Sequence, residues 1–415
     1  MSELILAPDT ARRRFRRPSS LAFYLQASII VFFLAGSSAP TPLYALYQGE
    51  WSFSPITTTI VFGVYAVAVL IALLTVGSLS DYIGRRPVLL AAVLVQALAM
   101  LAFASASSVD ELLLIRVIQG LSTGAAVAAV GAGMLDIDRA RGTIANSVSA
   151  PIGTALGAIG SGLLVQFLPA PTHLVYLVLF GVFVIQGVGV ALMPETSSRR
   201  PGALASLRVS LALPAAVRLP LLVAAPALVA VWALAGFYGA IGPSVIKRMI
   251  GHNSFVLGGA ALFALAATGA VTVMLLQKAA PRSVMLLGTI DLILGVGLTV
   301  LAIDASSIVI FFVGTVLAGA GFGAGFQGAI RSIVPLARPH ERAGVLSIVY
   351  VISYLAMGVP AIVGGFLVVH GGGLLVTARE YGVAVMVLAA LALVGLLVRR
   401  RTTVVACPPA ALLEA

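Results

Sequence analysis

The chain has 415 residues, of which 60% are hydrophobic and only 9% are charged, and its mean hydropathy is +1.11. Soluble domains contain about 45–50% apolar and about 25% charged residues, so this composition excludes a soluble protein and indicates a chain that lies mostly in lipid. The scarcity of charge also excludes a disordered chain, and the single cysteine, Cys407, excludes a disulfide framework or a thiolate metal cluster.

Twelve stretches are long and apolar enough to cross a membrane, which takes about 20 residues. In chain order they are 18–49, 51–80, 87–109, 112–135, the two parts of 142–194, 220–245, 254–276, 283–303, 306–330, 343–369 and 380–398. The stretch 142–194 is too long for one helix, and the Pro-containing segment 168–173 divides it. We therefore predict an all-α membrane protein with 12 transmembrane helices in two six-helix bundles.

Charged and polar segments divide these helices into five regions. We expect a basic cytoplasmic tail at 1–20, a six-helix bundle at 21–194, a cytoplasmic linker at 195–219, a second bundle at 220–398 and a cytoplasmic tail at 399–415. The arginines before the first helix resemble the start of a signal peptide, but the apolar stretch that follows is longer than the 7–15 residues of such a signal. We interpret it as a retained first helix.

The basic residues are distributed unequally between the two sides of the predicted bundle. Of the 25, the tails and even-numbered loops carry 21, the odd-numbered loops carry three (Lys247, Arg248 and Arg379), and Arg116 lies within a span. Because cytoplasmic loops are enriched in Lys and Arg, both termini are predicted to be cytoplasmic, in a bacterial inner membrane. The net charge of +11 then reflects topology and not a nucleic-acid partner.

Two pairs of short segments are similar at a separation of about 200 residues. Gly120-Leu-Ser-Thr-Gly124 is similar to Gly319-Ala-Gly-Phe-Gly323, and each lies in the fourth helix of its half. Segments 138–142 and 339–343 follow in the next loop of each half. The equal offset predicts a parallel repeat of six helices with a cavity between the halves.

The loop between the second and third helices carries the most specific motif. Its sequence, Gly77-Ser-Leu-Ser-Asp81-Tyr-Ile-Gly84-Arg85-Arg86, fits G-x-L-x-D-x-x-G-R-[RK] at every defined position. In this the chain resembles the major facilitator superfamily of secondary transporters. A weaker similarity lies in the fourth helix, where Arg116-Val-Ile-Gln119-Gly120 resembles a motif of proton-coupled members. The resemblance implies alternating access, with the first and fourth helices of each half lining the cavity.

The residue types of this loop predict a conformational latch. Gly77 would let the second helix approach a neighbour closely, and Gly84 would supply a tight turn. Asp81 places a negative charge at the cytoplasmic face, where its complement is the positive N-terminal end of the eleventh helix, near 342–344 in the other half.

The two arginines of the loop have candidate partners at the end of the fourth helix. We expect Arg85 and Arg86 to meet Asp136 or Asp138 there. Such pairs would hold the cytoplasmic side together and break when it opens, as a two-state element must. The alternative is that these charges only follow the rule that favours basic cytoplasmic loops.

Ionisable residues within a membrane are costly and mark candidate functional sites. Arg116, with Gln119 on the same helix face, is a candidate substrate or proton-relay group; the alternative is structural pairing with Gln26, Ser37 or Asp110. Asp291 is the carboxylate deepest within a predicted span, and it is either a proton site or a buried packing group bonded to a neighbouring helix.

A further set of polar and aromatic residues is expected to line the pathway. These are Ser38, Thr41 and Tyr44 on the first helix, Trp232 and Tyr238 on the seventh, and Phe326 and Gln327 on the tenth, with Ser37, Phe237 and Phe322 beside them. Aromatic walls with few polar groups suit an apolar or amphiphilic ligand. The prolines Pro40, Pro42, Pro243 and Pro360 are expected to kink their helices.

The sequence favours secondary transport over catalysis. We find no catalytic constellation, metal-ligand cluster, cofactor motif or nucleotide-binding loop, so we expect neither an enzyme nor a cofactor. The predicted function is proton-coupled export of a small organic molecule by a monomer in the bilayer. The alternative is proton-coupled import of a sugar or an organic acid.

Overall fold

The computed structural model describes residues 20–398, and within that range it is helical and has no strand. Helices of the first half are α1 (Ser20–Ser38), α2 (Pro40–Trp51), α3 (Pro55–Thr75), α4 (Ser80–Ile83), α5 (Arg85–Ser105), α6 (Val109–Ile137), α7 (Arg139–Phe167) and α8 (Pro171–Leu192). Those of the second half are α9 (Ala215–Ala240), α10 (Gly242–Ile250), α11 (Phe255–Leu275), α12 (Pro281–Asp304), α13 (Ile308–Ile333), α14 (Arg342–His370) and α15 (Leu374–Val398). Short 3₁₀ turns lie at Ala205–Leu207 and Val334–Leu336.

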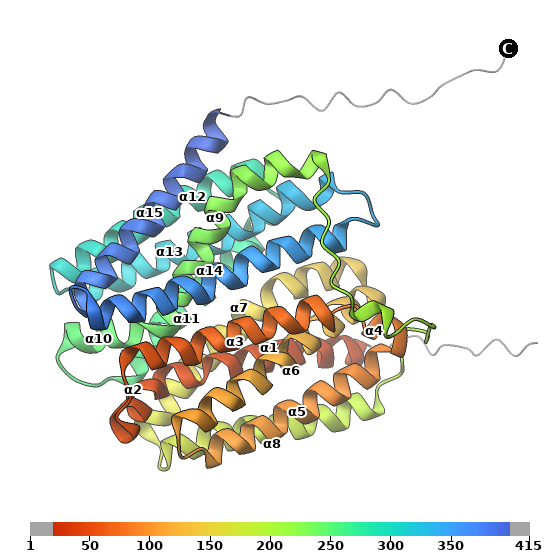
Figure 1. Ribbon diagram of the computed structural model, residues 1–415, viewed down its shortest axis with the longest axis horizontal. Helices are drawn as coiled ribbons and strands as arrows, with labels where there is room; N and C mark the ends of the chain where they lie inside the picture. Colours follow the sequence, from red (N-terminus) through yellow and green to blue (C-terminus); the bar gives the residue numbers. More distant parts are fainter. Residues whose placement is uncertain (1–19, 399–415) are drawn as a thin grey trace, which may run out of the picture.

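The helices form two bundles that lie side by side, α1–α8 in one and α9–α15 in the other (Figure 1). Twelve spans are long and apolar enough to cross a membrane, which confirms the predicted fold class. The halves meet along a seam where α3 packs against α14 and α7 packs against α11. We call the end of the molecule crossed by the connecting segment 193–214 the linker face, and the other end the opposite face.

The internal repeat predicted from the glycine segments is present in the packing. Gly120 and Gly124 of α6 lie against α3, and Gly319 and Gly323 of α13 lie against α11, the equivalent pair of helices in the second half. A Cβ atom at any of the four would come within 2.6 Å of the neighbouring helix. Small residues allow this close approach of helix backbones within a membrane.

The prolines act mostly at helix starts, which differs from the prediction that all four kink helices. Pro40 and Pro42 lie at the beginning of α2, and Pro243 lies at the beginning of α10, where the missing N–H has no intrahelical partner to lose. Pro360 does lie inside α14. The first and seventh predicted spans are therefore each divided into two helices, at Ala39 and at Ile241.

The last helix begins at Leu374, six residues earlier than the predicted 380. The prediction placed the start of this helix too late, because Arg379 and Glu380 interrupt the uncharged stretch of sequence. In the structure Arg379 forms an ion pair of 2.7 Å with Asp304 at the end of α12. A charge near the opposite face is thus compatible with the first turns of a membrane helix.

Close contacts seal the seam toward the opposite face. Thr59 of α3 packs on Gly365 of α14, and a Cβ at Gly63 would strike the side chain of Ile362. On the other side of the seam, Gly259 of α11 lies directly on the backbone of Ala158 in α7. All of these residues lie in the half of their helices that is farther from the linker face.

Candidate functional site

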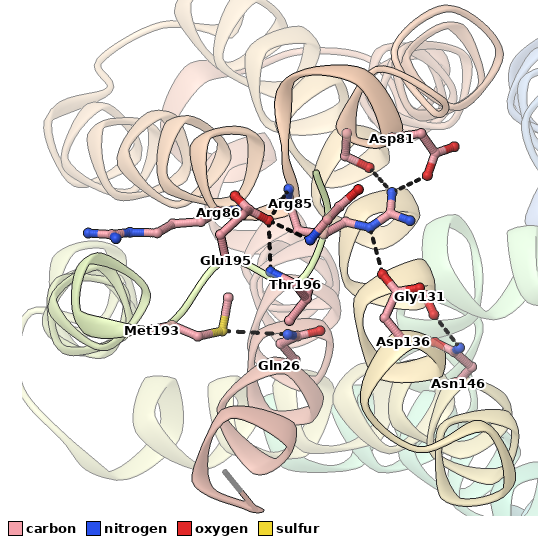
Figure 2. Close-up of polar contacts among 12 residues, drawn as sticks. Gln26, Asp81, Arg85, Arg86, Gly131, Asp136, Asn146, Met193, Glu195 and Thr196 are labelled. Atoms are coloured by element: carbon pink, nitrogen blue, oxygen red, sulfur yellow. Dashed lines mark hydrogen bonds and ion pairs between the residues drawn. The ribbon is translucent and has the colours of Figure 1, made fainter. Parts of the chain in front are cut away.

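The loop motif forms a charge cluster at the linker face (Figure 2). The guanidinium of Arg85 lies 2.5 Å from the carboxylate of Asp81 and 3.1 Å from that of Asp136 on α6, and it donates to the hydroxyl of Ser80 at 2.7 Å. Arg85 is 5% exposed, but the side chains of Asp81 and Asp136 are 50% and 36% exposed, so water partly screens both ion pairs. The predicted pairing of Arg85 with Asp136 is present in the structure.

Glu195 completes this cluster, although no pattern in the sequence indicates it. Its carboxylate accepts hydrogen bonds from the backbone N–H groups of Arg85, at 2.8 Å, and Arg86, at 3.1 Å, and also from those of Thr196 and Ser197 (Figure 2). A carboxylate at the N-terminus of α5 satisfies free N–H groups and faces the positive end of the helix dipole. Glu195 therefore fastens the segment after α8 to the start of α5.

Both glycines of the motif serve the turn. Gly84 has φ of +103°, and a Cβ there would overlap the carboxylate of Glu195. Gly77 follows the end of α3, and a Cβ there would strike the carbonyl of Leu73 in the same helix. The side chain of Ala128 on α6 would lie 3.8 Å from the same Cβ, so Gly77 also lies beside a neighbouring helix, as predicted, although its closest contact is within its own segment.

Three expected partners of the motif are not joined in this conformation. The ion pair of Asp81 is with Arg85 and not with the start of α14. Arg86 donates to the carbonyl of Ala191 and not to an aspartate. Asp138 caps α7 by accepting from the N–H of Arg141.

The connecting segment bridges the two halves at the linker face. Ser78 donates to the carbonyl of Ser206 at 2.9 Å, and the N–H of Arg200 donates to the carbonyl of Tyr82 at 2.8 Å. Farther along, Ala212 packs directly on Gly344 of α14. The same segment thus contacts the motif loop in the first half and the start of α14 in the second.

Arg116 lies in the centre of the first half and is 0% exposed. It donates to the carbonyl of Ser37 at 3.0 Å, to the amide oxygen of Gln119 at 2.6 Å and to the hydroxyl of Tyr44. Gln119 in turn donates to the carbonyl of Gly36 at 3.0 Å. The structure therefore brings together three residues predicted for the site, namely Arg116, Gln119 and Tyr44.

Aromatic rings complete the surroundings of this cation. The guanidinium carbon of Arg116 is 5.2 Å from the ring centroid of Tyr65 and 5.8 Å from that of Phe103. Among the described residues it forms no ion pair. A buried charge without a counter-ion is costly, and here carbonyls, a hydroxyl and ring faces supply the compensation.

An unsatisfied amide lies next to this group. Gln96 of α5 is 0% exposed, and neither its amide nitrogen nor its amide oxygen has a hydrogen-bond partner. A Cβ at Gly36 would lie 3.3 Å from the Gln96 amide nitrogen and 3.7 Å from that of Gln119. Sequence reasoning missed Gln96, because an isolated glutamine in an apolar helix gives no sign of which way it points.

The second half contains an aromatic cluster built around Trp232 of α9. Its ring lies 6.3 Å from that of Phe322 and 5.4 Å from those of Phe326 on α13 and Tyr354 on α14. The indole N–H of Trp232 is buried and has no acceptor. We call these four residues the aromatic cluster; Trp232, Phe322 and Phe326 were predicted from the sequence, and Tyr354 was not.

The aromatic cluster lies beside the seam. A Cβ at Gly358, one turn beyond Tyr354 on α14, would lie 3.5 Å from the side chain of Ala66 on α3, across the seam in the first half. Gln327, on the same helix as Phe326, donates to the carbonyl of Val273, and its amide oxygen is buried without a partner. The cluster itself thus contains one unused donor, the indole N–H of Trp232, whereas Gln327 bonds to α11.

Two residues predicted to line the pathway, Ser38 and Tyr238, bond inside a half instead. Ser38 donates to the carbonyl of Thr154 at 2.9 Å, between α1 and α7. Tyr238 shares a 2.8 Å hydrogen bond with Thr315 inside the second half. Thr41 is 1% exposed and lies in α2, which packs against α7 in the first half and α11 in the second.

Asp291 is separated from the other candidates. It lies midway along α12, which packs between α13 and α15 and not at the seam. It is half-buried, and its carboxylate forms no hydrogen bond or ion pair with the described residues. The expected bond to a neighbouring helix is therefore not found.

The sequence model of the Major Facilitator Superfamily matches residues 27–278, more than half of the chain. The chain belongs to this superfamily. No curated protein matches it significantly in sequence. As a superfamily member with 12 spans it is a multi-pass membrane transporter.

Solved structures of transporters share the fold. A bacterial homologue of the human lysosomal transporter Spinster, in an inward-facing conformation, matches with a TM-score of 0.73 at 13% identity, over 90% of this chain and 96% of that one. A variant of the nucleoside transporter NupG matches with a TM-score of 0.66 at 12% identity, over 91% and 98%. At such identities the similarity establishes the fold alone.

Proposed function

We propose that the protein exports a small, apolar or amphiphilic aromatic molecule by alternating access, driven by the proton gradient across a bacterial inner membrane. The aromatic cluster at the seam is the observation that carries this proposal. Four rings on three helices offer stacking surfaces, while the indole N–H of Trp232 offers an unused donor. Apolar walls with a few unused polar groups are typical of small-molecule sites.

The orientation follows from the basic residues. Within the described range the linker face carries the charged loops of the motif and of the connecting segment, whereas the opposite face carries Lys247, Arg248 and Arg379. The positive-inside rule then assigns the linker face to the cytoplasm. With the seam packed toward the opposite face, this conformation is the one that would receive substrate from the cytoplasm.

Import of an organic acid by proton symport is the second candidate. The observation that favours it is Arg116, a cation without a counter-ion. In this conformation, however, Arg116 is fully buried and its two terminal nitrogens donate to Ser37, Gln119 and Tyr44, which leaves only the buried Nε–H without an acceptor, so a substrate does not reach it. Export of an uncharged or weakly polar molecule fits the aromatic cluster beside the seam better.

A tryptophan titration tests the substrate site. The chain has two tryptophans, so Trp51→Phe leaves Trp232 as the sole reporter. We expect neutral aromatic compounds to quench or shift its fluorescence in nanodiscs. Trp232→Phe keeps a ring but loses the N–H donor. In a competition assay with one of these compounds in radiolabelled form, the variant should bind the same compounds about five-fold more weakly.

Transport completes the test. Proteoliposomes with an imposed proton gradient should accumulate the compounds that quench Trp232, and Trp232→Ala should abolish this accumulation. The Trp51→Phe protein is the matched control and should transport normally, because Trp51 stacks on Tyr47 away from the seam cluster. Normal transport by Trp232→Ala would contradict the proposed site, and accumulation that requires an organic acid would favour the second candidate.

A further inference from the structure

A cavity of about 410 Å³ lies on the seam at the opposite face. Both halves line it: Gln48 and Thr58 belong to the first half, and Ser244 and Lys247 belong to the second. Its base is the Thr59–Gly365 contact that seals the seam. We call it the seam pocket, and its volume is within the range of small-molecule sites.

The charge of the seam pocket is positive. Lys247 and Arg248 of α10 line it, both are exposed, and neither forms an ion pair within the described part of the chain. No aspartate or glutamate is among the described residues that line it. The remaining basic residue of this face, Arg379, is neutralised by Asp304.

Two general effects bear on these cations. Lys247 and Arg248 lie in the last turn of α10, where a positive charge favours the helix dipole. The positive-inside rule opposes them, because it disfavours basic residues on the face away from the cytoplasm. The dipole explains a cation at a helix end, but it does not explain two cations that border a cavity free of acidic residues.

The rest of the lining defines the chemical class of the ligand. Thr58, Ser244 and Gln48 supply hydroxyl and amide groups, while Ile241 and Val368 supply apolar surface. Two cations beside hydroxyl donors suit a carboxylate, since charge-assisted hydrogen bonds are the strong ones. The apolar part suits a small hydrocarbon body attached to it.

We propose that the seam pocket binds a small organic anion from the solution at the opposite face, and that the bound anion holds the two halves in this conformation. Because the walls come from both halves, opening the opposite face would separate the groups that contact the anion. A ligand that binds one conformation more tightly shifts the population toward it. The anion would thus slow the transport cycle from outside, whatever molecule is transported.

Benzoate and its neutral isostere benzamide provide a matched pair of probes. We expect the purified full-length protein to bind benzoate and not benzamide in isothermal titration calorimetry. The double variant Lys247→Gln/Arg248→Gln should bind benzoate at least about tenfold more weakly. Arg379→Gln, a charge loss on the same face but outside the pocket, should bind as the unmodified protein does; equal binding by all three proteins, or of both probes, would overturn the proposal.

Spin-label distances test the conformational part. Exposed Gly49 and His252 lie at the opposite face in different halves, so Gly49→Cys/His252→Cys in a Cys407→Ser background reports its opening. Benzoate should raise the population with the short distance, and the Lys247→Gln/Arg248→Gln background should abolish that response. Benzoate binding without a change in the distances would overturn this part.

Lipid composition distinguishes a soluble anion from a lipid headgroup. In nanodiscs of phosphatidylcholine, with or without phosphatidylglycerol, benzoate affinity should be the same. A loss of benzoate binding in phosphatidylglycerol would assign the pocket to the headgroup and overturn a soluble ligand. Calorimetry and distances need no transport, so a failed transport assay with intact benzoate binding contradicts the proposed function alone.

Discussion

At the scale of single residues, Arg116 illustrates how a charge is retained in an apolar bundle. Its partners are uncharged: the carbonyl of Ser37, the amide of Gln119, the hydroxyl of Tyr44 and the ring of Tyr65. These groups hold the planar guanidinium of Arg116 in one orientation. A substitution that changes the shape of this side chain alters its contacts with both α1 and α2. We therefore place its role in the coupling between helices and not in direct contact with substrate.

Arg116→Lys keeps the charge but loses the planar fork, and we expect it to lose gradient-driven transport. Arg116→Ala leaves the polar groups of Tyr44 and Gln119 unsatisfied, at about 1–3 kcal/mol for each, partly offset by the removal of a buried charge. The expected result is a folded protein with a lower melting temperature and no driven transport, measured by thermal unfolding and proteoliposome uptake.

Arg331→Lys is the matched control for these variants. Arg331 donates to the carbonyls of Leu276 and Ala279 near the linker face, and a lysine can replace part of that contact. It should transport normally. If Arg116→Ala retained substrate binding but lost accumulation, the role of Arg116 would be proton coupling. If Arg116→Ala retained full gradient-driven transport, Arg116 would have only a packing role.

At the scale of helices, backbone proximity depends on glycine at a few positions. A Cβ at Gly124 would lie 2.6 Å from both the side chain of Ala72 and the carbonyl of Val69. We expect Gly124→Ala to destabilise the protein by about 1–3 kcal/mol through overpacking. Gly160→Ala is the control, because a Cβ at that position would have no atom within 4 Å. Equal melting temperatures of the two variants would contradict the prediction and show that α3 and α6 can move apart without cost.

The contact between Glu195 and the start of α5 predicts a local change in dynamics. Glu195→Gln removes the charge that accepts from the N–H groups of Arg85 and Arg86, so their amides should exchange with deuterium faster. Glu341→Gln is a comparable change, since Glu341 accepts from the N–H of Arg338 at the other linker-face loop. It should leave exchange at Arg85 and Arg86 unaltered, and unaltered exchange in Glu195→Gln would contradict the proposed clamp.

The sequence predicts elements well and orientations poorly, for a physical reason. A span is defined by about 20 apolar residues, and the loop motif has fixed spacing, so both the bundles and the Arg85–Asp136 pair could be predicted, whereas the pairing of Asp81 with Arg85 was not. Ser38 and Tyr238 were assigned to the wrong face, because a membrane helix is apolar toward lipid and toward its neighbours and so has no stripe that orients it. Glu195 and Tyr354 could not be predicted, since their partners are distant in sequence.

At the scale of the whole molecule, the two faces differ in how the halves are joined. The opposite face is joined by direct helix packing, such as Thr59 on Gly365, whereas the linker face is bridged by the segment 193–214. During transport the direct packing must move from the opposite face to the linker face and back. In the state that is closed at the linker face, Asp81 would reach the N-terminus of α14, whereas here its ion pair is with Arg85.

Asp81→Asn removes a half-exposed ion pair here, but Arg85 keeps Asp136 and Ser80 as partners, so the larger loss is expected in the state that is closed at the linker face and the substitution should favour the conformation described here. Loss of a half-exposed charge–dipole contact is worth about 0.3–1 kcal/mol, or a two- to five-fold change in population. Spin labels at Ala140 and His340, exposed residues of different halves at the linker face, would report a larger share of the long distance. Unchanged distances with normal transport would contradict the latch.

The position of Arg116 along the chain also bears on biosynthesis. Its partners, from Ser37 to Gln119, all lie within the first 119 residues, and four of them precede it. Inserting an arginine at the centre of a membrane helix costs about 2.5–3.5 kcal/mol on the insertion scale, and Arg116, two turns into α6, bears part of that cost. Since the sheltering groups leave the ribosome before or immediately after Arg116, the charge can be enclosed while the second half is still untranslated. The first four spans are thereby suited to assemble as a cotranslational unit, onto which the later helices are added.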